Sequence, residues 1–475
     1  MLQLVLIASA LGGTAHAAQG LSYNGLALTP QMGWNNWQAF GCNVDADLMV
    51  ESSNAIVKLH LKDLGYEYVV MDDCWSNGRD DQGKLRYNET RFPKGIKGVS
   101  DHVHSLGLKW GMYSSAGRWT CGGYEGSLDH EKDDAQSFAD WGVDYLKYDN
   151  CFNEGRSGTP KLSYDRYKAM SDALNATGRP ILYSICNWGD DSPWNWASTI
   201  SNSWRTNGDL YDTYDKPDAR CPCDDDEFYC MLPGFMCSMM NTLNKAAHYV
   251  SKAQPGGWND LDILQVGNGG MTDDEYVTEF SMWAALKSPL LMGMDLRKVD
   301  PKSYSIYTNP AVIAINQDPA GSSAARIWRY FVDDIDEYGR GEISLWSGAL
   351  DNGDQVVALV NAGNKEREMN ATLSDIFGAT SESAKKAWDV YDLWGKRLDD
   401  KTASKIIANN GSVDASKYLY NATKTSYAEG IKNNDPMLFG TKVDTVQAQG
   451  TLKATVARHG VGFFRLRPNS DKTEL

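Results

Sequence analysis

The chain has 475 residues, of which 42% are hydrophobic and 11% aromatic, so it can fill two large cores. Its formal net charge of −16 disfavours nucleic acids and anionic membranes as partners and leaves a neutral ligand as the natural one. The 16 Trp and 24 Tyr residues agree with a sugar ligand, because flat aromatic faces stack on sugar rings, although most of them will simply be core.

The N-terminus is typical of a secreted protein. Residues 1–17 form an apolar run that ends in Ala15-His16-Ala17, the pattern of a signal-peptide cleavage site, so we expect a signal peptide over residues 1–18. The run is too short to cross a membrane. We therefore expect the mature protein outside the cell or in a periplasmic or cell-wall space. Five N-x-S/T sequons fit a glycoprotein: Asn88, Asn175, Asn370, Asn410 and Asn421.

Strand-like segments with polar or Gly-rich tips recur eight times in the first two thirds of the chain. They cover residues 31–37, 66–75, 109–117, 143–151, 180–188, 203–209, 257–264 and 287–296. Helical patterns lie between most of them, at residues 47–64, 132–141, 163–175 and 273–286. Thr272 and Glu275 have the spacing of a capping box before the last helix. Eight strand–helix repeats predict a closed (β/α)8 barrel over residues 19–324.

The pattern changes after the predicted barrel. Short alternating runs follow at residues 327–332, 342–346, 355–361, 387–393, 450–456 and 460–466, with turn residues such as 351–354 between them. This arrangement predicts an antiparallel β-sandwich over residues 325–475. Residues 399–441 show no clear period, and we predict no structure for them.

Charged side chains gather at the predicted strand tips, which meet at one mouth of a barrel. Strand two ends in Asp72 and Asp73, strand four in Lys147 and Asp149, and strand six in Arg205 and Asp209, while strand seven carries Asp260 and Asp262. The chain has seven His but no H-E-x-x-H, G-x-S-x-G or phosphate-binding glycine motif. We expect neither a metal nor a cofactor, and carboxylates remain as the reactive groups.

Two carboxylates that face each other across a bond suffice for glycoside hydrolysis. Asp149 is the candidate nucleophile, because Lys147 on the same strand face would lower the pKa of its carboxyl and keep it ionised. The alternative is a plain salt bridge between Asp149 and Lys147. Asp209 is the candidate acid, a role that needs a less charge-compensated position with like charges nearby.

The nine cysteines leave at least one thiol unpaired. Positions after adjacent strands make the pairs Cys42–Cys74 and Cys121–Cys151 geometrically sensible. Nesting within one loop gives Cys221–Cys237 and Cys223–Cys230, and the absence of C-x2-C spacing there disfavours zinc. Cys186 is left over inside strand five, either as a small buried hydrophobe or as a ligand contact.

Eight motifs resemble those of the secreted α-galactosidases of glycoside hydrolase family 27, especially the yeast melibiases. They are LTPQMGWNNW (28–37), DDCW (72–75), YSSAG (113–117), YLKYDNC (145–151), CNWG (186–189), WRTNGD (204–209), GGWND (256–260) and INQD (315–318). The motifs span the whole barrel in order, and the sandwich matches the yeast branch too. One departure is Ser251, where the yeast relatives carry a glutamine that helps to bind sugar.

The resemblance implies a barrel with a C-terminal β-sandwich and a retaining double displacement. Asp149 matches the nucleophile and Asp209 the acid/base. The implied galactose contacts are Asp72 and Asp73 to the C4 and C6 hydroxyls, Lys147 to C3 and C4, Arg205 on the C2 side, Trp34 on the apolar face, and Tyr113, Cys121 and Asn187 as the wall.

We therefore expect a secreted exo-α-galactosidase that acts on melibiose, raffinose-type sugars and related neutral α-galactosides. One alternative is an α-N-acetylgalactosaminidase, which would need small residues in the strand-five loop where Cys186-Asn187-Trp188 stands. Another alternative is a non-catalytic galactose-binding module, which would lack one of the two carboxylates. The yeast relatives suggest a homo-oligomer, and we expect a tetramer.

Overall fold

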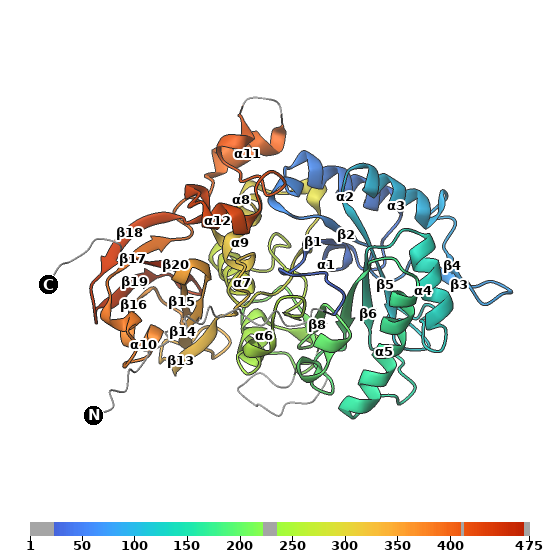
Figure 1. Cartoon of the computed structure of the whole chain (residues 1–475), viewed down its shortest axis with the longest axis horizontal. Coiled ribbons are helices and arrows are strands. Elements are labelled where there is room, and N and C mark those ends of the chain that lie inside the picture. The colour runs from blue at the N-terminus through green and yellow to red at the C-terminus, as the bar shows by residue number, and fades with distance from the viewer. Residues whose placement is uncertain (1–22, 222–234, 410–412, 470–475) are drawn as a thin grey trace, which may run out of the picture.

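The computed structural model describes residues 23–221, 235–409 and 413–469, which form two packed parts. The expected signal peptide, the Cys223–Cys230 pair and Asn410 lie outside these residues. Figure 1 shows the blue-to-green first part at one end of the molecule and the orange-to-red C-terminal strands at the other. Within the described residues, no helix is long and apolar enough to cross a membrane.

The first part is built around eight parallel strands, in the spatial order β11-β8-β7-β6-β5-β2-β1-β12. Leu264, just beyond β11, forms a parallel bridge with Met292 of β12 and closes the ring. All eight strands fall within the predicted segments, and the (β/α)8 fold is confirmed. Their bounds are β1 Met32–Asn35, β2 Tyr68–Val70, β5 Lys109–Ser115, β6 Tyr145–Asp149, β7 Leu182–Cys186, β8 Ser203–Arg205, β11 Trp258–Asp260 and β12 Leu290–Met292.

Helices and short strands follow the barrel strands: α1 Trp37–Phe40, α2 Ala46–Lys58, β3 Ser76–Arg79, β4 Leu85–Tyr87, α3 Gly95–Ser105, α4 Glu131–Asp140, α5 Pro160–Ala176, β9 Asp209–Leu210, β10 Phe235–Cys237, α6 Met239–Ala246, α7 Asp273–Ala285, α8 Pro301–Tyr307 and α9 Pro310–Asn316. The capping box of Thr272 and Glu275 starts α7 as predicted. The helix predicted over residues 47–64 is broken after Lys58, because His60 takes a left-handed φ of 59°. The His102-x-His104 pair lies on α3, where His104 Nε2 is 2.7 Å from Asp144, away from the strand tips.

The C-terminal part contains a six-stranded antiparallel sheet in the order β13-β14-β15-β20-β17-β18, covered on one face by the pair β16-β19. The bounds are β13 Ala325–Phe331, β14 Glu342–Ala349, β15 Gln355–Asn361, β16 Arg367–Thr372, α10 Leu373–Phe377, β17 Trp388–Asp392, β18 Thr441–Val446, β19 Thr451–Val456 and β20 Val461–Pro468. No element was predicted at β16, α10 or β18. β16 and β18 are polar, partly exposed strands with few apolar residues.

The central strand β15 of the six-stranded sheet is buried on both faces. In β15, Val357 and Leu359 point into the sandwich, whereas Val356, Ala358 and Val360 belong to the same apolar cluster as Trp283 of α7 and Ile313 of α9. This alternation follows from the two-residue period of a strand. The two parts therefore share one continuous core, and α7 and α9 lie between them (Figure 1).

Residues 399–441, for which the sequence predicted nothing, contain α11 Asp400–Ala408 and α12 Tyr427–Lys432. The segment reaches back to the barrel, where the Tyr427 hydroxyl donates to the carbonyl of Leu64 at 3.1 Å. The amide of Ala422 donates to the carbonyl of Asp63 at 2.6 Å. Its short helices depend on these contacts with the barrel rather than on a helical period of their own.

Candidate active site

Asp149 is the last residue of β6 and is paired in register with Ser115 of β5 and Cys186 of β7. Its carboxylate is 6% exposed and accepts hydrogen bonds from the Tyr113 hydroxyl at 2.8 Å and the Asn150 amide at 2.9 Å. Burial raises the pKa of Asp149 to about 6, although the Lys147 cation and the Tyr113 hydrogen bond both lower it. The carboxylate of Asp209 raises it further.

Lys147 points to the same face of β6 as Asp149 but pairs with another residue. Its ammonium lies 2.8 Å from Asp72 Oδ2 and passes over the ring of Tyr113, with 5.4 Å between Nζ and the ring centroid. The plain Lys147–Asp149 salt bridge is therefore wrong. The expected direction of the Lys147 effect on Asp149 is correct, but desolvation is the larger influence, so the pKa of Asp149 is raised rather than lowered.

Asp72 and Asp73 follow β2 and are both buried. Asn35 donates to Asp72 Oδ2 at 2.8 Å, and Asn36 accepts from the Asp72 amide at 2.8 Å. Asp73 accepts from the amide of Gly122 at 2.7 Å, and burial raises the pKa of its carboxyl. Backbone and amide groups thus fix both carboxylates at the mouth of the barrel.

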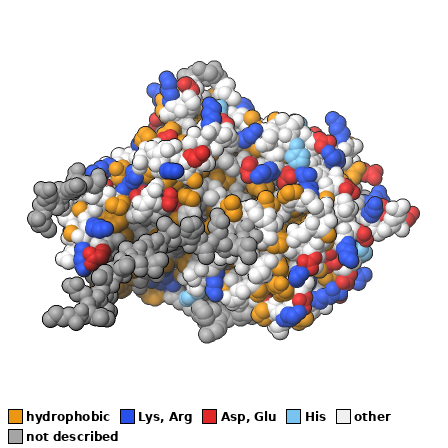
Figure 2. All heavy atoms as spheres, in the orientation of Figure 1, with side chains coloured by type: hydrophobic (Ala, Val, Ile, Leu, Met, Phe, Trp, Pro, Cys, Tyr) orange, Lys and Arg blue, Asp and Glu red, His pale blue; other side chains and the backbone are white. Residues whose placement is uncertain are grey.

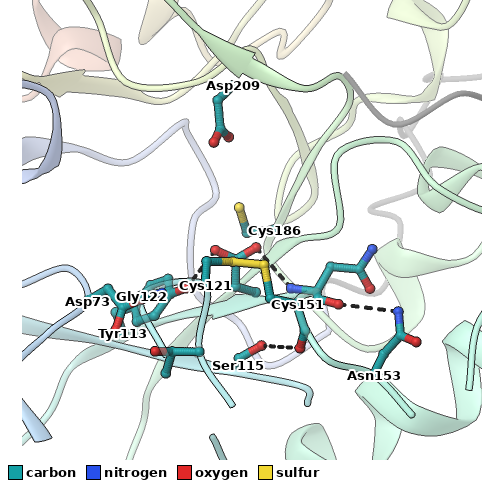
Figure 3. Close-up of a disulfide and its surroundings, with 12 residues drawn as sticks. Asp73, Tyr113, Ser115, Cys121, Gly122, Cys151, Asn153, Cys186 and Asp209 are labelled. Carbon is teal, nitrogen blue, oxygen red and sulfur yellow. Dashed lines mark hydrogen bonds between the residues drawn. A yellow bond between two sulfur atoms is a disulfide. The ribbon is translucent and has the colours of Figure 1, made fainter. Parts of the chain in front are cut away.

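Two disulfides brace this mouth: Cys42–Cys74 includes the residue after Asp73, and Cys121–Cys151 includes the second residue after Asp149. Cys221–Cys237 is also present. Figure 3 shows the Cys121–Cys151 bridge with the side chains of Cys186 and Asp209 pointing toward each other above it. A Cβ at Gly117 would lie 1.8 Å from the carbonyl of Cys151, so only glycine allows these loops to approach. Among the cysteines that the structure describes, Cys186 is a buried free thiol.

Asp209 begins β9, and its side chain is 49% exposed. Arg205 Nη2 lies 3.0 Å from Asp209 Oδ1 and 2.9 Å from Asp262 Oδ2, while Arg205 Nη1 contacts Cys186 Sγ at 3.6 Å. The expectation of a less charge-compensated Asp209 is therefore wrong in one respect, because a guanidinium contacts it directly. The expected like charges are present, since the charge of Asp209 raises the pKa of both Asp149 and Asp262.

Asp260 and Asp262 were not among the expected site residues, although both lie at a predicted strand tip. Both are buried, and burial raises the pKa of each carboxyl, while Arg205 lowers it. Arg205, the ion-pair partner of Asp262, is distant in the sequence. Their place at a strand end could have indicated both residues, and the GGWND motif also contains Asp260.

The remaining expected residues lie around this group. Trp34 is buried on β1, where its indole donates to the carbonyl of Met294 at 2.8 Å. Asn187 directly follows β7, and its amide donates to the carbonyl of Asp190 at 2.6 Å. Its buried Oδ1 has no hydrogen-bond partner among the described residues. Cys121 is exposed on its loop, and so is Ser251 in the short turn Val250–Lys252.

The geometry gives an ionisable carboxylate at the floor, a second carboxylate at the rim and a ring of buried polar groups between them. These groups can carry out acid–base and nucleophilic chemistry at a glycosidic bond. The fold and the site therefore define a glycoside hydrolase that uses two carboxylates.

The comparisons with known proteins narrow this class. Residues 29–318 match the family model described as alpha galactosidase A, and residues 340–413 match the alpha galactosidase C-terminal beta sandwich domain. The chain belongs to the α-galactosidase (melibiase) family. It is 55% identical over 472 residues to an alpha-galactosidase of Torulaspora delbrueckii, covering 99% of this chain and 98% of that protein. The structure of an alpha-galactosidase from Saccharomyces cerevisiae superposes with a TM-score of 0.92 at 54% identity, covering 94% of this chain and 99% of that one. The same values hold for that enzyme's structure with raffinose.

Proposed function

We propose that the protein is a retaining exo-α-galactosidase that removes terminal non-reducing α-D-galactose from melibiose, raffinose-type oligosaccharides and related α-galactosides. The observation that carries this proposal is the buried Asp149 at the end of β6, held by Tyr113 and electrostatically coupled to Asp209. The relative from Saccharomyces cerevisiae whose structure contains raffinose supports the substrate class.

The proposed reaction has two displacements at C1 of galactose. In the first, the carboxylate of Asp149 attacks C1 while the carboxyl of Asp209 gives its proton to the glycosidic oxygen, so the C1–O bond breaks and an ester to Asp149 forms. In the second, Asp209 takes a proton from water, the water oxygen attacks C1, and Asp149 leaves as a carboxylate. Two inversions give a product of retained α configuration.

The electrostatics suit the first step. The nucleophile must be ionised, and the pKa of about 6 at Asp149 means that it loses its proton in the weakly acidic range. Formation of the ester removes a charge from a buried position, which relieves the desolvation that raised this pKa. The proposed binding residues follow the family resemblance: Trp34, Asp72, Asp73, Tyr113, Cys121, Lys147, Asn187 and Arg205.

We also propose that the protein is secreted, glycosylated and oligomeric. Support for secretion comes from the signal-like N-terminus and the three disulfides. Support for a homo-oligomer comes from exposed apolar side chains on β13 and the loop after it: Ile327, Tyr330, Phe331, Ile335 and Tyr338. On the face shown in Figure 2, positive and negative side chains are interspersed over the barrel end. Light scattering after size-exclusion chromatography tests the tetramer.

One assay tests the enzymatic proposal. The secreted protein is incubated with nitrophenyl α-galactoside and with its N-acetylgalactosaminide analogue, beside Asp149→Asn and Asp209→Asn. We expect turnover of the galactoside only, and its loss in Asp149→Asn. Undiminished turnover by Asp149→Asn would falsify the assignment of the nucleophile. Following the first product anomer by NMR tests retention, and net inversion would exclude the double displacement.

A further inference from the structure

Arg205 stands between two carboxylates that share one of its nitrogen atoms. Its Nη2 lies 2.9 Å from Asp262 Oδ2 and 3.0 Å from Asp209 Oδ1. The side chains of Arg205 and Asp262 are 3% and 4% exposed, whereas that of Asp209 is 49% exposed. Because water screens a charge pair less when it is buried, Asp262 competes effectively with Asp209 for this cation.

Asp262 is held in place from several sides. Its Oδ2 accepts from the amide of Leu210 at 2.8 Å, and Leu210 is the residue that follows Asp209. Its Oδ1 accepts from the amide of Ile263 at 2.8 Å, and its carbonyl accepts from the indole of Trp283 at 2.9 Å. The backbone of Asp262 takes a φ of 94°, which residues other than glycine rarely adopt. Such a conformation persists only where the surroundings enforce it.

We propose that Asp262 is a positioning residue for Asp209. It anchors the backbone beside Asp209 through the Leu210 amide, and it takes part of the Arg205 charge that would otherwise hold Asp209 as an anion. Asp209 is thereby aimed at the leaving oxygen and can carry the proton that this oxygen receives. The inference rests on the proposed acid/base role of Asp209, and it adds a residue that neither the sequence motifs nor the comparisons assign.

Two opposing influences act on the charge of Asp262. Burial is the larger and raises the pKa of its carboxyl, whereas Arg205 lowers it and favours the anion that this role requires. The charged groups that face it are Arg205 of β8, Asp209 of β9, Asp260 of β11, Lys147 of β6 and Glu279 of α7. Removing the negative charge of Asp262 leaves Asp209 as the carboxylate in contact with the Arg205 cation, which opposes the transfer of a proton from Asp209.

The test uses the full-length enzyme and two substrates that differ in their need for an acid. The sugar that leaves from melibiose would depart as an alkoxide and needs a proton, whereas the nitrophenolate of nitrophenyl α-galactoside leaves with little assistance. Asp262→Asn keeps an oxygen that can accept from the Leu210 amide and removes the charge. We expect kcat/KM for melibiose to fall about tenfold more than kcat/KM for the nitrophenyl substrate. We also expect the alkaline limb of the pH profile of kcat/KM for melibiose to move to lower pH by about one unit.

A matched control separates positioning from structure. Asp212 ties the same two loops together, because it accepts from the Gly270 amide at 2.5 Å and the Tyr276 hydroxyl at 3.0 Å, but it belongs to another hydrogen-bond cluster. Asp212→Asn should change both substrates by the same factor and leave the alkaline limb in place. An equal loss on both substrates in Asp262→Asn, with an unmoved limb, overturns the proposal.

Two further variants close the test. If Asp262→Asn is not secreted, Asp262→Glu replaces it, because the charge is kept while the added methylene displaces the Leu210 contact. A lower ratio of melibiose to nitrophenyl kcat/KM with an unmoved limb supports the proposal, and an unchanged ratio contradicts it.

Asp209→Ala tests the underlying acid/base role of Asp209 separately, since azide should restore turnover and give α-galactosyl azide. If azide rescues Asp209→Ala but the Asp262 variants keep the wild-type ratio of melibiose to nitrophenyl kcat/KM, the acid/base role of Asp209 stands. The positioning role of Asp262 is then refuted.

Discussion

Removal of the buried charge of Asp149 should stabilise the protein while it abolishes activity. The carboxyl has a pKa of about 6 in the fold against 3.8 as its ordinary value. Between these two values the folded state binds more protons than the unfolded state, so stability falls as the pH rises from about 4 through about 6. The difference of about 2 pH units corresponds to about 3 kcal/mol of stability that is lost by pH 7.

Asp149→Asn mimics the neutral form at every pH. The amide keeps an oxygen for the Asn150 N–H, and the Tyr113 hydroxyl can rotate to accept from the new NH2 group. For a chain of 475 residues, unfolding entropy is about 1 kcal/mol per degree, so the midpoint should rise by about 3 °C at pH 7 and very little at pH 4. Turnover should fall about a thousandfold or more.

The assay is thermal unfolding followed by circular dichroism at pH 4 and pH 7, at one scan rate. The control is Asp101→Asn, which removes an exposed carboxylate paired with Lys97 on α3 and should shift either midpoint by less than about 1 °C. A midpoint for Asp149→Asn at pH 7 that does not exceed the wild-type value refutes the reasoning. So does a gain of equal size at both pH values, because desolvation of the charge then plays no part.

Three further changes test the groups that surround Asp149. Lys147→Met removes the cation that lowers the pKa of Asp149, so the acid limb of kcat/KM should move to higher pH by about one unit; an unmoved limb speaks against this influence. Tyr113→Phe removes the 2.8 Å hydrogen bond to Asp149, so kcat should fall about tenfold and the same limb should rise less, as a pH series of initial rates will show. Replacing both Cys121 and Cys151 by alanine opens a loop with a sequence separation of 30, and urea unfolding should show a loss of about 3–4 kcal/mol.

The sequence by itself determined the architecture and much of the site. Hydrophobic period and polar tips located all eight barrel strands, since a strand that is buried on both faces must turn polar where the chain leaves the core. The capping box at Thr272 needed only residues within one turn. The three expected cysteine pairs that lie within the described residues are present; two of them join the loops after adjacent strands, and Cys221–Cys237 lies within one loop. The family motifs supplied the roles proposed for Asp149 and Asp209, which spacing alone left open.

The tertiary structure decided which charges meet. Lys147 and Asp149 are two residues apart, yet Lys147 pairs with Asp72, which reaches it across β5 only after the barrel closes. Arg205 likewise divides between Asp209, four residues away, and Asp262, which is brought in by the pairing of β8 with β11. Desolvation, the largest influence on the pKa of Asp149, has no counterpart in a one-dimensional pattern. Burial and ion pairing depend on neighbours that are distant in sequence, and these are properties of the assembled barrel mouth.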